Sequence, residues 1–189
     1  MKTYLRPVRL FDYDKLMELF IDCFMDDPYY KKIYPDDKVR HDKMVTDFGE
    51  VFKYCIQHNW VGSIWSDKDM LGFLIGFDYW YTRKNDKSIF NLMFTGNMED
   101  SNYQSTSEIH NKICNLHGDT MYLIDIGIRK DHRKEGLATE LIKDALNKYY
   151  NYNVVADIDN MCYMSLYEKL GFDISDLGEN YKFVQYKVH

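Results

Sequence analysis

The chain has 189 residues, of which 46% are hydrophobic and 29% charged, and its formal net charge is -6. This length suits one domain with an ample core, and the acidic balance argues against a general nucleic-acid-binding protein. The apolar runs are too short to span a membrane, and no apolar leader follows Met1, so we expect a cytoplasmic protein. Four scattered cysteines without a CxxC pair predict reduced thiols, and six histidines without HxxxH or HxH spacing argue against a metal site.

The first half of the chain predicts a strand, two helices and a hairpin. The strand covers residues 3–10, and a helix follows that Asp12 or Asp14 would cap. After a break over residues 26–37, a second helix is expected to bury one apolar face, made of Val45, Phe48, Phe52, Cys55 and Ile56. Residues 60–80 then predict an antiparallel hairpin.

The second half begins with residues 83–119, which predict an insertion containing two short helices. A strand follows over residues 121–128, then a helix with an apolar stripe over 137–146 and a strand over 153–158. The next helix would be capped by Asp159 or Asn160 and ended by Gly171 in a left-handed conformation, before two closing strands. This mixture of hairpins and strand–helix–strand units predicts a mixed sheet with helices on both faces, in one domain.

A basic run precedes the helix at 137–146. Its members are Arg129, Lys130, His132, Arg133 and Lys134. Gly136 then lets the main chain approach a ligand closely, and Ala138 keeps the next exposed position small. A helix start offers unpaired N–H groups and the positive end of the helix dipole, so this turn suits a pyrophosphate. Considered alone, the motif is also compatible with a solvated charged loop.

A second pattern lies downstream, where Tyr167 follows Asn160 by seven residues and Gly171-Phe172 ends the helix. A tyrosine on the inner face of this helix could offer its hydroxyl to a cleft between strands. The alternative is a packed core tyrosine, since the chain has 17 tyrosines.

Together the two patterns resemble the GNAT superfamily of acyl-CoA-dependent N-acetyltransferases. The family's pyrophosphate loop, Gln or Arg followed by x-x-Gly-x-Gly/Ala, is matched by Arg133, Gly136 and Ala138. Its later arrangement of Asn, Tyr and Gly-Phe is matched by Asn160, Tyr167, Gly171 and Phe172. The resemblance covers most of the chain, is tightest over 121–172 and weakest over 83–119. It implies an α/β (mixed α+β) fold with a central, mostly antiparallel sheet flanked by helices, a helical insertion around 83–119, and a single domain over residues 1–189.

The resemblance also implies a function: transfer of an acetyl group from acetyl-CoA to a primary amine, by direct attack in a ternary complex and without a metal. The residues implied to hold the coenzyme are Ile126, Gly127, Ile128, Arg133, Lys134, Glu135, Gly136, Leu137, Ala138, Thr139, Asn160 and Tyr167. A main-chain N–H near Ile126 would polarise the thioester carbonyl, and Tyr167 would protonate the departing thiolate. Asp125 is the candidate base, or else a carboxylate that orients the substrate or supports the structure.

Two alternatives to a small-amine acetyltransferase remain open. One is a non-catalytic acyl-CoA-binding sensor on the same fold, which the retention of Tyr167 disfavours. The other is a peptide or protein N-acetyltransferase, which differs only in its acceptor. In each case we expect a monomer or homodimer that binds neither nucleic acid nor membrane.

Overall fold

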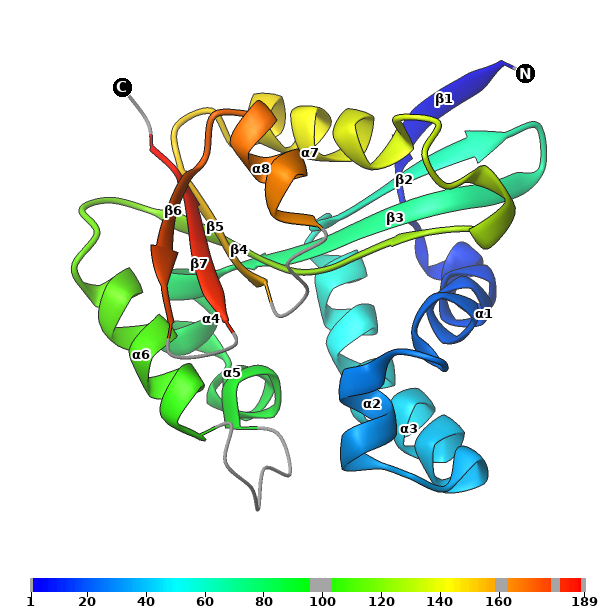
Figure 1. Cartoon of the computed structure of the whole chain (residues 1–189), viewed down its shortest axis with the longest axis horizontal. Helices are drawn as coiled ribbons and strands as arrows, with labels where there is room; N and C mark the ends of the chain where they lie inside the picture. The colour runs from blue at the N-terminus through cyan, green and yellow to red at the C-terminus, as the bar shows by residue number, and fades with distance from the viewer. Residues whose placement is uncertain (1, 96–102, 159–162, 178–180, 188–189) are drawn as a thin grey trace. The chain divides into compact units, whose positions relative to one another are not determined.

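The computed structural model (Figure 1) describes residues 2–95, 103–158, 163–177 and 181–187. Seven strands form a mostly antiparallel sheet in the order β1-β2-β3-β4-β5-β7-β6, in which β4 and β5 are parallel. The strands are β1 (Thr3–Pro7), β2 (Val61–Ser66), β3 (Asp69–Asp78), β4 (Thr120–Ile128), β5 (Asn153–Ile158), β6 (Asp173–Asp176) and β7 (Lys182–Tyr186). The α-helices are α1 (Tyr13–Phe24), α2 (Pro28–Ile33), α3 (Asp37–Gln57), α4 (Tyr79–Asn85), α5 (Lys87–Thr95), α6 (Tyr103–Cys114), α7 (Leu137–Lys148) and α8 (Met164–Lys169). The predicted fold class is confirmed, and the described part of the segment 83–119 contains the end of α4 and the helices α5 and α6.

The chain divides into two compact units, residues 1–75 with 125–144 and residues 76–124 with 145–189. The strands β3 and β4 and the helix α7 contribute residues to both units. Among the helices within the described ranges, none has the length and apolar character needed to cross a bilayer.

The core of the first unit is a cluster of aromatic rings from α1, α3 and β3. The ring centroid of Phe20 lies 4.9 Å from those of Phe48 and Phe52 and 6.4 Å from that of Phe73. Such ring pairs stabilise a core by about 0.5–1.5 kcal/mol each beyond the area that they bury. The cluster confirms the predicted apolar face of α3 at Phe48 and Phe52, whereas Val45 is exposed and the prediction was wrong there.

Two glycines allow β3 and β4 to approach closely within the first unit. A β-carbon on Gly127 would lie 2.5 Å from a ring carbon of Phe73, which is itself fully buried. A β-carbon on Gly72 would lie 2.5 Å from Cδ1 of Ile128 and 3.0 Å from the main-chain oxygen of Gly127. Packing alone therefore favours glycine at both positions.

Asp12 immediately precedes α1, yet its side chain makes no capping hydrogen bond to that helix. Its carboxylate accepts hydrogen bonds from the Arg6 guanidinium at 2.7 and 2.8 Å and from the Arg9 main-chain N–H at 3.0 Å. These donors, Arg6 first, lower the pKa of Asp12. The predicted cap is therefore wrong in its chemistry, because the stronger charged partner on β1 holds the carboxylate.

The predicted break at residues 26–37 contains the short helix α2, which begins with Pro28 at the position where proline is best tolerated. A buried arginine holds this segment in place. Arg40 is 1% exposed; its Nε donates to the oxygen of Met25 at 2.9 Å, and its Nη1 donates to those of Tyr34 at 2.6 Å and Pro35 at 3.3 Å. Three main-chain carbonyls around α2 thus depend on one side chain.

In the second unit the parallel ladder joins β4 to β5 and ends where Tyr122 faces Val155. The strand β4 continues beyond this ladder to Ile128. Just past the last paired residues, the Tyr122 hydroxyl donates to the carboxyl group of Asp157. Burial raises the pKa of Asp157 in spite of this hydrogen bond.

Candidate functional site

The loop that leads into α7 ends in a glycine with a left-handed backbone. Gly136 has a φ of 87°, is exposed, and a β-carbon built on it would meet no heavy atom within 4 Å. The first helical hydrogen bond of α7 runs from the Glu140 N–H to the Gly136 oxygen at 3.1 Å. Among the described residues, no main-chain oxygen accepts a hydrogen bond from the N–H groups of Leu137, Ala138 and Thr139. The helix start therefore presents three N–H donors beside open space, an arrangement that suits a phosphate group.

Three of the five basic side chains before this turn have carboxylate partners. The closest contacts join Arg129 to Asp131 at 3.2 Å, Lys130 to Asp22 at 3.4 Å and His132 to Glu135 at 3.3 Å. Much of the basic run thus neutralises local acidic groups, a contribution that the sequence pattern did not reveal.

Arg133 and Lys134 differ from the other three. No carboxylate of the described residues lies within 4.0 Å of either cation, and both side chains are exposed. The Nε of Arg133 donates to the main-chain oxygen of Ile128 at 3.1 Å, which holds the guanidinium beside the end of β4. Lys134 has a φ of 68°, an uncommon value for a residue with a side chain. The positive charge that remains for a ligand therefore comes from these two residues.

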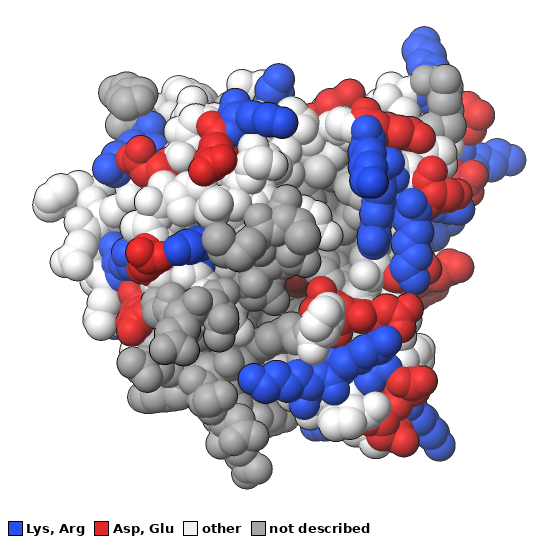
Figure 2. Space-filling view, viewed as in Figure 1, with Lys and Arg blue, Asp and Glu red and all other residues white. Residues whose placement is uncertain are grey.

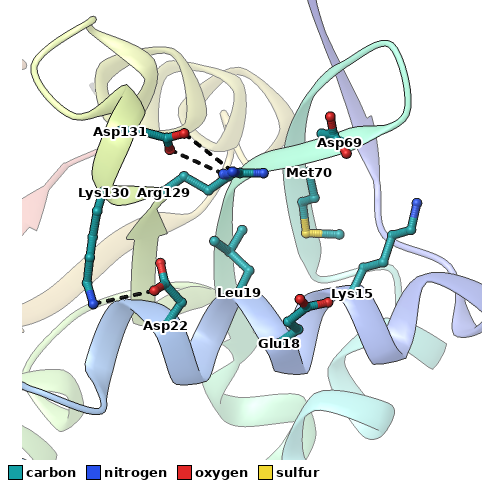
Figure 3. A pocket seen from close by; sticks show the side chains of 9 residues that line it. All are labelled: Lys15, Glu18, Leu19, Asp22, Asp69, Met70, Arg129, Lys130 and Asp131. Carbon is teal, nitrogen blue, oxygen red and sulfur yellow. Dashed lines mark hydrogen bonds and ion pairs between the residues drawn. The ribbon is translucent and has the colours of Figure 1, made fainter.

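A surface hollow of about 500 Å³ lies beside the same run (Figure 3). Arg129 and Lys130 line it together with Glu18 and Asp22 of α1, and Lys130 reaches across to Asp22. Figure 2 shows the same mixing of Lys and Arg with Asp and Glu on the right of the view. Walls of both signs do not favour a polyanion, so this hollow suits a phosphate less well than the start of α7 does.

The end of β4 is tied to α1 by a cysteine. The Sγ of Cys23 donates to the oxygen of Ile128 at 3.4 Å, the same oxygen that Arg133 contacts. Burial is the main cause that raises the pKa of Cys23 to about 11, so the thiol keeps the proton that it donates. No local pattern in the sequence signals this contact, because Ile128 lies 105 positions from Cys23 along the chain.

Asp125 and Ile126 are half-buried on β4, and Gly127 is buried. These residues belong to the first unit, together with Ile128 and the loop 133–139. The residues of β4 that are predicted to hold the coenzyme and the predicted pyrophosphate loop therefore lie in one compact unit.

Tyr167 belongs to the second unit, where it is 6% exposed on α8. Its ring packs edge-on against Phe172 at 5.2 Å between centroids, and its main-chain oxygen accepts from the Phe172 N–H at 3.1 Å. Gly171 has a φ of 84°, which confirms the predicted left-handed end of this helix. The predicted caps Asp159 and Asn160 lie outside the described residues, as does the predicted role of Asn160 in binding coenzyme.

Within the described ranges, no group of three or more His, Cys, Asp or Glu side chains is placed to hold a metal ion.

Several solved structures with similar folds are N-acetyltransferases. PaiA N-acetyltransferase from Thermoplasma acidophilum, in complex with coenzyme A, is 12% identical to this chain in sequence. The two structures superpose with a TM-score of 0.64, and the alignment covers 99% of each chain. Polyamine N-acetyltransferase from Drosophila melanogaster is 10% identical, with a TM-score of 0.61 and 97% of each chain covered. A mosquito arylalkylamine N-acetyltransferase-like protein is 12% identical, with a TM-score of 0.62 and 100% of each chain covered. At these identities the similarity establishes the fold.

A search of curated proteins finds no match to the chain. The model of the acetyltransferase (GNAT) family matches residues 13–172, which include both the glycine-started turn of α7 and the helix that carries Tyr167. The chain therefore belongs to the GNAT acetyltransferase family.

Proposed function

We propose that this protein transfers an acetyl group from acetyl-CoA to a primary amine by direct attack in a ternary complex. The observation that carries the proposal is the start of α7, where Gly136 leaves open space beside three main-chain N–H donors. The charges of Arg133 and Lys134 add to the attraction of this turn for a pyrophosphate. Together with Glu135, these residues would hold the phosphates of the coenzyme.

The main chain of β4 is proposed to hold the pantetheine arm. The strand runs from Thr120 to Ile128, but its parallel ladder with β5 ends at Tyr122, and the residues from Ile126 to Ile128 lie beyond that ladder. Main-chain groups on such an edge can pair with an amide-bearing ligand as they would with another strand. The N–H of Ile126 is then proposed to donate to the thioester carbonyl oxygen as negative charge develops there.

Two side chains are proposed for proton transfer. The Tyr167 hydroxyl on α8 would give a proton to the sulfur of the departing coenzyme. Asp125 on β4 would accept a proton from the attacking amine, directly or through water. A role in orienting the acceptor is the alternative for Asp125.

The acceptor is proposed to be a small amine. Two proteins with the same fold are an agmatine N-acetyltransferase and a polyamine N-acetyltransferase, and their names describe small amine acceptors. The fold also occurs in a ribosomal-protein-S18-alanine N-acetyltransferase from Escherichia coli, so a peptide acceptor is the second candidate. A panel of small amines, polyamines and peptides, followed by release of free CoA thiol, distinguishes the two.

Binding of the coenzyme is tested first, because it does not require the acceptor. Acetyl-CoA should raise the melting temperature in proportion to the logarithm of its concentration. No shift at millimolar acetyl-CoA, together with no heat in a calorimetric titration, would overturn the proposal.

Substitution of Tyr167 tests whether the protein is an enzyme or a non-catalytic sensor. Tyr167→Phe keeps the ring that packs on Phe172 and removes only the hydroxyl. The matched control is Tyr163→Phe, which removes the hydroxyl of a 53% exposed tyrosine four residues earlier. Slow turnover in Tyr167→Phe alone supports the acid role, whereas binding without turnover in the wild type would favour the sensor.

A further inference from the structure

The helical segment of the second unit carries a cluster of reactive side chains that the proposed acetyl transfer does not use. Tyr79 and Arg83 lie one helical turn apart on α4, and His110 and Cys114 lie one turn apart on α6. The Tyr79 hydroxyl contacts Nδ1 of His110, and Nε2 of His110 lies 3.4 Å from Sγ of Cys114. Nη1 of Arg83 lies 3.9 Å from the same sulfur. Two pairs at helical spacing thus converge on one thiol.

The proton positions on Tyr79 and His110 decide which atom donates in each hydrogen bond of this cluster. Tyr79 is fully buried, and burial raises its pKa, so its hydroxyl keeps a proton to donate to Nδ1 of His110. Burial, and then the charge of Arg83, lower the pKa of His110, so the ring is neutral near pH 7. A neutral imidazole that accepts at Nδ1 carries its proton on Nε2, where it donates to Cys114.

The sulfur of Cys114 therefore receives an imidazole N–H and lies beside a guanidinium. Both turn positive charge toward the sulfur, and they offset the partial negative charge at the C-terminal end of α6, where Cys114 is the last residue. Cys114 is also exposed, so a reagent can reach it. Cys55, by contrast, is buried without such donors among the described contacts, and burial raises its pKa.

We propose that Cys114 is a site of reversible thiol–disulfide exchange, and that it reacts with low-molecular-weight disulfides that carry carboxylates. The Cys114 thiolate attacks one sulfur of the disulfide; a new S–S bond forms, the original S–S bond breaks, and the displaced thiolate leaves with its electron pair and takes up a proton. The disulfide is the oxidant, and a free thiol reverses the reaction. The preference for carboxylates comes from Arg83, an exposed cation beside the sulfur.

The test compares two small disulfides of opposite charge, oxidised glutathione and cystamine. The folded full-length protein is incubated with each disulfide, the reaction is quenched with acid, and the labelled cysteine is identified by peptide mass spectrometry. Each rate of labelling is divided by the rate at which the same disulfide reacts with N-acetylcysteine amide, a free model thiol. We expect Cys114 to be the labelled cysteine among those that the structure describes, and to favour oxidised glutathione. Cys114→Ser should remove this label.

Two variants test the cluster itself. Arg83→Met should slow the reaction of Cys114 with oxidised glutathione about threefold or more, since it removes the cation that attracts the carboxylates of this disulfide. The control is Lys84→Met, which removes the same charge from the next residue of α4. His110→Phe keeps a ring beside Tyr79 but removes the N–H donor. It should slow the reaction of Cys114 with both disulfides.

The proposal fails if Cys114 reacts no faster than N-acetylcysteine amide with oxidised glutathione. It also fails if Arg83→Met and Lys84→Met change the rate equally. Since Arg83 and Lys84 are both exposed, either variant should fold, and their melting temperatures verify this.

Discussion

Replacing Gly136 by alanine separates the conformational role of this residue from its role toward a ligand. A β-carbon there meets no heavy atom within 4 Å, so the added methyl group causes no clash in the free protein. The remaining cost is the left-handed backbone, about 1–2 kcal/mol for a residue with a side chain. For a chain of this length, that cost lowers the melting temperature by roughly 2–8 °C.

The same methyl group occupies the open space through which a phosphate would approach the N–H groups of α7. A hydrogen bond to a charged group contributes about 1.5–3 kcal/mol, so the loss of one such bond weakens coenzyme affinity by roughly 10- to 150-fold. The two effects of Gly136→Ala are thus a modest loss of stability and a large loss of affinity.

Gly118→Ala is the matched control for backbone strain. Gly118 has a φ of 92°, is exposed, and its nearest neighbour to a new β-carbon is Nδ2 of Asn153 at 4.0 Å. Thermal melts without ligand should show similar losses in both variants, and calorimetric titration with CoA should show weaker binding only in Gly136→Ala. Wild-type affinity in Gly136→Ala would refute the assignment of the phosphate site. An equal loss of affinity in Gly118→Ala would trace the effect to general destabilisation.

Three further predictions concern single residues. Tyr167→Phe should lower kcat by roughly 10²–10⁴-fold with little change in coenzyme affinity, measured by steady-state kinetics and calorimetry, and full activity would remove Tyr167 from the mechanism. Arg40→Met leaves three carbonyls without their donor and should lower the free energy of unfolding in urea by about 2–5 kcal/mol; a loss below about 0.5 kcal/mol, the range of ordinary surface substitutions, would show that water replaces the arginine. Because its raised pKa means that folded Asp157 binds its proton more tightly than the unfolded chain, the free energy of unfolding should fall as the pH rises from 3.8 through the folded pKa. Asp157→Asn should remove this component from urea titrations across pH, and an unchanged pH dependence would contradict it.

The predictable parts of the fold are those in which local spacing and tertiary packing agree. Leu137, Leu141 and Ile142 recur at helical spacing, and all three are buried on α7. Gly136 and Gly171 precede or end helices where only a left-handed backbone fits, so glycine marks both turns in the sequence itself.

The parts that sequence reasoning missed depend on partners that are distant along the chain. Asp12 has the side chain of a helix cap, but Arg6 on β1 holds its carboxylate. Arg40 reads as one more surface charge in a polar segment, and only the folded chain shows that it is buried against three carbonyls. The basic run likewise appears free in the sequence, whereas Lys130 meets the acidic side chain of Asp22 on α1.

The contact between Gly127 and Phe73 restricts how this sequence can change over evolution. Alanine at position 127 would place its methyl group 2.5 Å from a ring that Phe20 and Phe24 also contact, so the ring has little room to move. A smaller residue at position 73 would first have to open that space, and it would leave a cavity in the aromatic cluster until the methyl group filled it. The two positions therefore form an epistatic pair. Each substitution alone is unfavourable, and alanine at position 127 fits only after a smaller residue has replaced Phe73.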